Sequence, residues 1–217
     1  LLVVSGQGGR RTLIRLDPDW LMQTKQVESF ESGLSRWHVW KPFGPARGYW
    51  RDRTPGPVLV AHPTRKMAKV LHIRKPDQKA PDCATWNFPA SNKGEITLRL
   101  LAKNGSGGVS LAFNNRFFNP VDNRGEQESA FVIRMASDGT PGKAIRLNPD
   151  RWHTLVVKWD LEKKRSLVVL NEKVVARRPI EIVPFGGVSY LRIRSTATDT
   201  DTAGVLIESV RADVEHP

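Results

Sequence analysis

The stretch that decides the fold class runs from Trp152 to Val175 and reads WHTLVVKWDLEKKRSLVVLNEKVV. Leu155, Val157 and Trp159 stand at every second position in it, with other side chains between them. A period of two is typical of a β-strand that buries one face. We therefore expect a strand here, with Trp159 in the core.

The same alternation recurs along the chain. It is strong from Glu95 to Ala102, where we expect Leu98 to be buried, and shorter examples lie in 67–73, 109–113, 131–135 and 191–193. Turn-forming clusters such as KNGSGG (103–108) and SDGTPG (137–142) separate these segments. No long stretch has helical periodicity, and 17 Gly with 15 Pro would interrupt most candidates. The sequence therefore predicts an all-β fold, an antiparallel two-sheet β-sandwich.

The segment from Trp152 to Val175 also resembles the hairpin of laminin G-like and concanavalin A-like modules. In them a Trp-led strand ends in an acidic residue, and the next strand leads into a short turn. Here the turn falls at Asn171, where the family more often has Gly, and Asn tolerates the left-handed region. The closing GVLIESVRADV (204–214) resembles the final strand of these jelly rolls, which pairs beside the first. The resemblance implies a carbohydrate-associated jelly roll.

The first residues read differently from the rest. LLVV (1–4) and TLIRL (12–16) form a plausible hairpin, and VESFESGLSRWHVW (27–40) looks like the opening strand of a new module. We expect residues 1–24 to be a hairpin and linker, and residues 25–217 to be the jelly roll. This junction resembles more faintly that of bacterial sialidase-like proteins, in which a β-propeller precedes a lectin-like module. That resemblance implies an upstream domain of the same protein and an extracellular or periplasmic location.

Composition narrows the partners. The chain has 34 basic and 22 acidic residues, a net charge of +12, which favours polyanions such as nucleic acid or acidic glycans. The basic residues are spread along the chain and match no nucleic-acid motif, which argues against nucleic acid. No run approaches the roughly 20 apolar residues that span a membrane. The lone Cys83 is expected to be a buried thiol.

A search for catalytic residues finds none to assign. Jelly-roll glucanases carry Glu-x-Asp-x-x-Glu on one strand, so that paired carboxylates share a face. Glu126 and Glu128 have the first spacing without the third carboxylate, and we interpret them as a solvated strand edge.

Candidate ligand-binding residues fall into two groups. Tyr190, Arg192 and Arg194 share one face of a predicted strand, and the guanidinium groups could bind a carboxylate or sulfate. The alternative is an exposed face with unrelated charges. Trp37, Trp40 and Trp50 lie among basic residues and could stack on a sugar ring, or they could be core residues. In contrast, we expect Trp86, Trp152 and Trp159 to be buried.

The best local cluster for a structural calcium ion contains Asp199 and Asp201, because calcium needs several oxygen ligands. The alternative is a polar loop. Taken together, the sequence favours a non-catalytic carbohydrate-binding or scaffolding module of a larger glycan-active protein. The competing hypothesis is a catalytic jelly roll, a glycoside hydrolase or polysaccharide lyase acting on anionic glycan.

Overall fold

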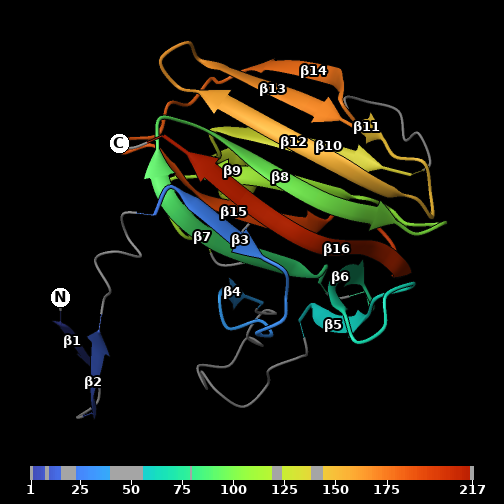
Figure 1. Cartoon of the computed structure of the whole chain (residues 1–217), viewed down its shortest axis with the longest axis horizontal. Coiled ribbons are helices and arrows are strands. Elements are labelled where there is room, and N and C mark those ends of the chain that lie inside the picture. Colours follow the sequence, from blue (N-terminus) through green and yellow to red (C-terminus); the bar gives the residue numbers. More distant parts are fainter. Residues whose placement is uncertain are drawn as a thin grey trace.

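The computed structural model describes residues 2–7, 10–15, 23–39, 56–78, 80–118, 124–137 and 144–215. Two sheets pack face to face in it, as the alternating pattern predicted (Figure 1). The predicted N-terminal hairpin is present as a separate two-stranded sheet of β1 (Leu2–Gln7) and β2 (Arg10–Arg15). No helix among the described residues has the length and apolar character needed to cross a bilayer.

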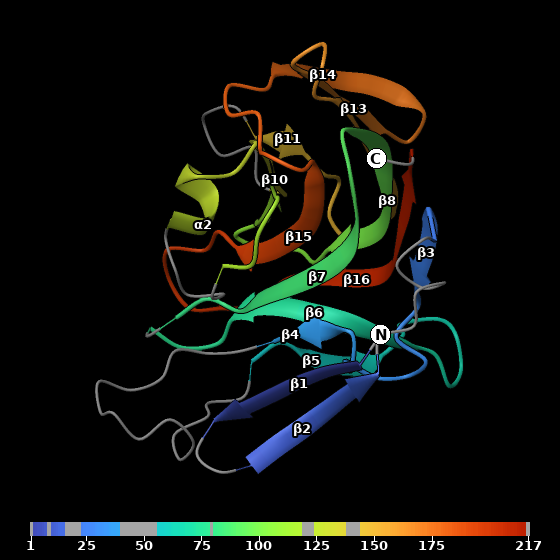
Figure 2. The same ribbon diagram turned by 90° about the vertical axis from the view of Figure 1, so that its left-hand side faces the viewer.

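The smaller layer of the sandwich has six strands. Its order is β11 (Ile145–Arg146), β10 (Phe131–Ala136), β9 (Val109–Asn114), β15 (Val188–Ser195), β7 (Cys83–Ser91) and β4 (Trp37–His38). Neighbours are antiparallel except for the short parallel pairing of β10 with β11. Figure 2 shows the short helix α2 (Arg124–Gln127) beside this layer, on the side away from the other sheet.

The larger layer has eight strands and includes both ends of the jelly roll. Its order is β14 (Lys173–Pro179), β13 (Arg165–Leu170), β12 (Trp152–Asp160), β8 (Lys93–Ala102), β16 (Asp201–Val214), β6 (Lys69–Lys75) and β5 (Val58–Ala61), with β3 (Lys25–Glu28) pairing on β16. The antiparallel pairing of β3 with β16 confirms that the closing strand lies beside the first strand of the module.

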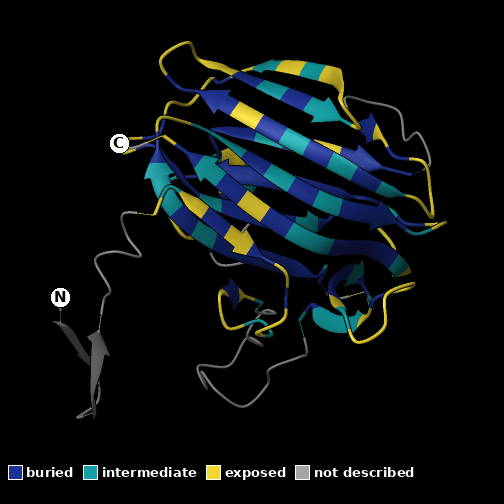
Figure 3. Ribbon diagram, viewed as in Figure 1, coloured by how far each residue is buried: buried dark blue, intermediate teal, exposed yellow. Residues whose placement is uncertain are grey.

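The core lies between the two layers and consists of the alternating side chains. Leu98 and Trp159 are 0% and 2% exposed, which confirms both predictions. Trp159 also donates its indole N–H to the carbonyl oxygen of Ser91 at 3.1 Å, so its polar atom has a partner. Figure 3 shows buried and more exposed residues alternating along the strands. Burial of these rows stabilises the fold by roughly 25 cal/mol per Å² of apolar surface.

The predicted turn between β13 and β14 consists of Asn171 and Glu172, with φ angles of 46° and 68°. Two successive positive φ values are characteristic of the tight turns whose twist matches that of the flanking strands. Asn is one of the residues that tolerates this conformation, so the departure from the more usual Gly is accommodated.

The prediction for Glu126 was wrong in its secondary structure. Glu126 lies in α2, and its side chain is only 16% exposed, whereas a solvated strand edge was expected. The four-residue helix is too short to give a helical period in the sequence.

Candidate functional site

The six-stranded sheet turns one surface away from the core, and we call this surface the front face. Strand register puts Asn87, Tyr190 and Asn114 in one row across it, from β7 through β15 to β9. Leu191, the next residue after Tyr190 on β15, is fully buried in the core, as the alternation along this strand predicted. Tyr190 therefore projects from a central strand of the front face, between two amide side chains.

Tyr190 belongs to an aromatic cluster on the front face. Its ring makes an edge contact with Phe117 at 6.4 Å between centroids, and Phe117 lies 4.9 Å from the ring of His38. Phe117 is 44% exposed, and Tyr190 is partly exposed. Phe117 and His38 come from segments far from Tyr190 in sequence, and no local pattern predicts that the three rings meet.

The side-chain amides of Asn87 and Asn114 make only some of their possible hydrogen bonds with other protein groups. Asn87 donates to the carbonyl oxygen of Ser189 at 3.0 Å, and Asn114 donates to that of Gly125 at 3.4 Å. The side-chain carbonyl oxygen of Asn114 is buried and has no protein partner among the described residues. Asn114 is only 2% exposed, so the amide that a ligand can reach at the border of the aromatic surface is that of the partly exposed Asn87. The aromatic rings and this amide offer stacking and directional hydrogen bonds in one place.

Arg192 is on the front face, as expected, but it is not part of an exposed stripe. The side chain is 1% exposed because α2 covers it, with Gly125 directly over the guanidinium group. The same guanidinium group hydrogen-bonds the thiol of Cys83. Burial raises the pKa of Cys83 to about 11, and the charges of Arg192 and Arg194 offset only part of this effect. Arg192 thus supports α2 on the sheet and has little surface to offer a ligand.

Arg194 and Glu126 belong to a second row on the front face. Ser110 of β9 lies in register between Arg194 of β15 and Arg134 of β10. Glu126 reaches this row from α2, and its Oε1 accepts a hydrogen bond from the Ser110 hydroxyl at 2.6 Å while its Oε2 accepts one from Arg134 at 2.7 Å. Burial alone would raise the pKa of Glu126, but Ser110, Arg134 and the charge of Arg194 together lower it.

The three tryptophans predicted as sugar contacts do not form one group in the structure. Trp37 is 5% exposed and lies in the core, where its ring is stacked at 6.0 Å from Trp86 and tilted at 5.7 Å from Phe30. Its position in β4, on the inward side, corrects the expectation of ligand contact. Trp40 and Trp50 lie outside the described residues.

The two predicted calcium ligands have different surroundings. Asp201 is 7% exposed, and its two carboxylate oxygens accept hydrogen bonds from the backbone N–H groups of Gly107 and Gly204 at 3.0 and 2.8 Å. Asp199 is exposed and accepts from the hydroxyl of Thr198 at 3.1 Å. The described residues contain no group of three or more acidic, His or Cys side chains placed to share a metal ion. Asp201 thus has a structural role, in which it holds the irregular start of β16 against the loop before β9.

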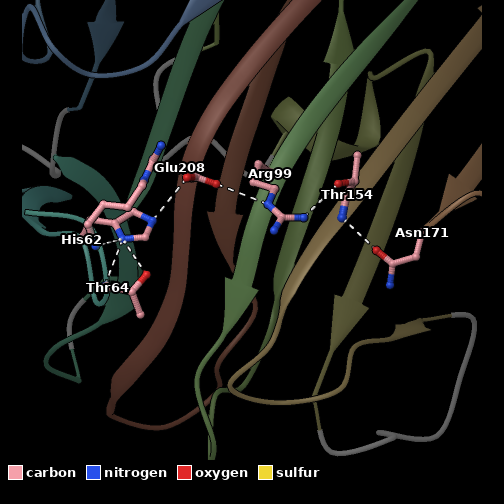
Figure 4. A network of polar contacts seen from close by, with 7 residues as sticks. His62, Thr64, Arg99, Thr154, Asn171 and Glu208 are labelled. Carbon is pink, nitrogen blue, oxygen red and sulfur yellow. Dashed lines mark hydrogen bonds and ion pairs between the residues drawn. The ribbon is translucent and has the colours of Figure 1, made fainter.

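A separate polar network crosses the outward surface of the eight-stranded sheet (Figure 4). Glu208 lies 3.3 Å from His62 Nε2 and 3.3 Å from Arg99 Nε, and it also pairs with Arg65. Arg99 donates to the hydroxyl of Thr154 at 3.1 Å. With its carboxylate shared between Arg65 and Arg99 and close to the ring of His62, Glu208 links β16 to β8 and to the segment after β5.

Trp152 lies next to this network, which corrects the prediction that it is a core residue. Its ring is partly exposed and stacks on His62 at 5.0 Å, and Arg99 lies 6.0 Å from it. Trp152 is in phase with the outward-facing Thr154 and Val156 of β12, so the alternation itself indicates an outward face for it.

Among the residues that the structure describes, the strand positions of the front face carry no paired carboxylates like those of a glycosidase. Outward residues on the central strands are uncharged or basic, among them Thr85, Asn87, Ser110, Ala112, Asn114, Tyr190, Arg192 and Arg194. The two nearby carboxylates are Glu126, paired with Arg134, and Glu128, paired with Arg116. A general acid at neutral pH needs a raised pKa, whereas the pKa of Glu126 is lowered.

No protein-family model matches the chain, and no curated protein matches its sequence. Solved structures do match its fold. A sialidase gives a TM-score of 0.55 at 12% identity over 87% of this chain, which spans 18% of the sialidase chain. A Bacteroides ovatus endo-glucanase of glycoside hydrolase family 16 gives 0.53 at 12% identity, covering 86% of this chain and 99% of that one. The metal-free carbohydrate recognition domain of Emp46p gives 0.50 at 10% identity, covering 86% and 92%.

These three proteins carry different functions on one architecture, and at such low identity the likeness shows the fold alone. It agrees with the two-sheet topology and with the pairing of first and last strands described above. The chain has the concanavalin A-like jelly-roll fold.

Proposed function

We propose that this chain is a non-catalytic carbohydrate-binding module that holds its ligand on the front face around Tyr190. The observation that carries the proposal is the partly exposed cluster of Tyr190, Phe117 and His38, with the partly exposed Asn87 beside Tyr190 on the adjacent strand. A sugar ring presents an apolar C–H face that packs on aromatic rings and hydroxyl groups that hydrogen-bond amides. Binding sites commonly combine such apolar surface with a few placed polar groups.

The absence of turnover is part of the same proposal. Hydrolysis of a glycosidic bond usually needs two carboxyl groups about 5 to 9.5 Å apart, one of them acting as an acid. Glu126 and Glu128 each pair with an arginine, and the lowered pKa of Glu126 keeps it ionised. This arrangement supports binding over hydrolysis.

The module would act within a larger protein and on glycans outside the cytoplasm. Residues 1–24 would be the end of an upstream domain and residues 25–217 the jelly roll. The match to a segment of a much longer sialidase supports this organisation. The net charge of +12 and the position of Arg194 near Tyr190 on β15 favour acidic over neutral polysaccharides.

A structural calcium ion at the loop of Asp199 is a further part of the proposal. Asp199 is exposed and would supply a carboxylate, whereas Asp201 already accepts two backbone hydrogen bonds. A rise in melting temperature on adding calcium, reversed by chelator and lost in Asp199→Asn, is the expected result. An unchanged melting temperature would remove calcium from the account.

The proposal is tested by incubating the chain with a panel of neutral, sulfated and uronate polysaccharides. Retardation in affinity electrophoresis reports binding, and mass spectrometry of the supernatant reports cleavage. We expect retardation by at least one polysaccharide and no released oligosaccharides. Release of oligosaccharides that is lost in Glu126→Gln or Glu128→Gln would favour a glycoside hydrolase, and loss in Tyr190→Phe would favour a lyase.

A further inference from the structure

The carboxylate of Glu126 lies among hydrogen-bond donors and positive charges that could hold a bound anion instead. It accepts hydrogen bonds from the Ser110 hydroxyl at 2.6 Å and from Arg134 at 2.7 Å, and the positive charge of Arg194 acts on it as well. The three basic or donor groups come from three adjacent strands, β9, β10 and β15. The carboxylate comes from outside the sheet, on α2.

These groups form a donor set that suits an external acid. Arginine forks recognise carboxylate and sulfate oxygens, and a hydroxyl donor adds a third directed bond. The guanidinium groups of Arg134 and Arg194 both act on the single carboxylate of Glu126. The net charge of these three side chains is therefore +1, and the two arginines alone carry +2. Strand pairing fixes the backbone positions of the three donors, whereas the Glu126 carboxylate is held by its side-chain contacts with Ser110 and Arg134.

A groove beside β10 brings solvent to Glu126 and Arg134 of this set. The groove has a volume of about 690 Å³, which is within the range of ligand-binding clefts. The residues that line it include Glu126, Arg134, Arg178, Glu181 and Ile182. Because Arg134 is 56% exposed, an acid that enters the groove meets this guanidinium group next to Glu126.

We propose that Ser110, Arg134 and Arg194 form an anion subsite for the acidic group of a glycan, and that Glu126 occupies it until a ligand displaces the side chain into the groove. The inference rests on the proposed glycan-binding function and assigns the ligand class as glycans bearing carboxylate or sulfate groups. No bond is made or broken. The ligand acid takes over the hydrogen bonds that Glu126 gives up.

Glu126→Gln tests the inference because it keeps the shape of the side chain and removes the competing charge. Glu128→Gln is the matched control, since it removes the same charge from a carboxylate that pairs with Arg116 instead. Calorimetry would measure the affinity of each variant for heparin, for polygalacturonate and for a neutral β-glucan at physiological ionic strength. Heparin and polygalacturonate distinguish sulfate from carboxylate recognition.

We expect Glu126→Gln to bind one acidic glycan about tenfold more tightly than wild type, a change of about 1.4 kcal/mol. Glu128→Gln should match wild type, and Glu126→Gln combined with Arg194→Ala should lose the gain. Arg194→Ala alone should weaken binding of the acidic glycan, which keeps the test available if Glu126→Gln does not fold.

Equal affinities of Glu126→Gln and Glu128→Gln, or a gain that survives Arg194→Ala, would overturn the subsite. Binding of the neutral glycan is expected to be the same in all variants, so a failed subsite with retained neutral binding leaves the proposed function standing. If no variant binds any glycan, the proposed function and the subsite both fail.

Discussion

Gly125 of α2 lies so close to Arg192 of β15 that a Cβ atom built on it would sit 2.7 Å from Nη1. Arg192 cannot easily retreat, because its side chain is 1% exposed among packed neighbours. The missing side chain at position 125 is therefore what lets α2 lie on the front face and deliver Glu126 to Ser110 and Arg134.

Gly125→Ala should consequently lift α2 from the sheet. We expect a loss of about 1 to 3 kcal/mol in the free energy of unfolding, the usual cost of overpacking. Urea denaturation measures it, with Gln127→Ala on the exposed side of the same helix as the control. Equal stability of the two variants would show that α2 does not depend on this close approach.

Trp159→Ala tests the core between the two sheets. The side chain is 2% exposed and packs near Phe88 and Phe113, so truncation should cost about 3 to 5 kcal/mol. The neighbouring Lys158 is exposed and pairs with Glu95 at the surface, so Lys158→Ala should cost no more than about 1 kcal/mol. Similar losses in both variants would contradict the assigned faces of β12.

Asp201→Ala tests the irregular start of β16. Removing the carboxylate leaves the N–H groups of Gly107 and Gly204 without their acceptor, which should cost about 1.5 to 3 kcal/mol. Asp199→Ala should have a much smaller effect, because Asp199 is exposed. Thermal or urea denaturation of the two variants measures both losses of stability. An equally large loss in Asp199→Ala would disprove the structural role assigned to Asp201 alone.

The raised pKa of Cys83 predicts that the stability of the fold depends on pH in the alkaline range. Its pKa is raised from 9.0 to about 11 in the folded chain, so the unfolded chain releases the thiol proton first. The stability linked to this group is therefore complete below pH 9 and falls as the pH rises toward 11. Cys83→Ala should reduce the slope of unfolding free energy against pH between these values, and parallel slopes for variant and wild type would refute the linkage.

The same burial predicts that the thiol reacts slowly. At pH 8 a disulfide reagent should label native Cys83 far more slowly than the urea-unfolded chain, because the thiolate is the reactive form and the residue is 1% exposed. Rapid labelling of the native chain would contradict the burial of Cys83.

The fold could be predicted from the sequence because its signals are local. Alternation placed Leu98 and Trp159 in the core, and Asn171 marked a turn that needs positive φ. The pairing of β3 with β16 followed from a family resemblance at the closing strand.

The candidate site was less predictable because it depends on contacts between distant segments. Tyr190 and Arg194 were identified on the correct face of β15, but Phe117 and His38 join Tyr190 only through tertiary packing. Arg192 looked like a surface residue because alternation cannot reveal that a short helix covers a sheet. Trp37 occupies a two-residue strand, too short for alternation to show which face it takes.

The most direct test of the account measures glycan affinity in Tyr190→Ala. Calorimetry with the best ligand of the polysaccharide panel would compare wild type, Tyr190→Ala and Val174→Ala, which truncates an exposed residue at the edge of the other sheet. We predict that Tyr190→Ala lowers affinity at least about tenfold, or about 1.4 kcal/mol, while Val174→Ala binds like wild type. Unchanged affinity in a folded Tyr190→Ala variant would contradict a glycan site on the front face.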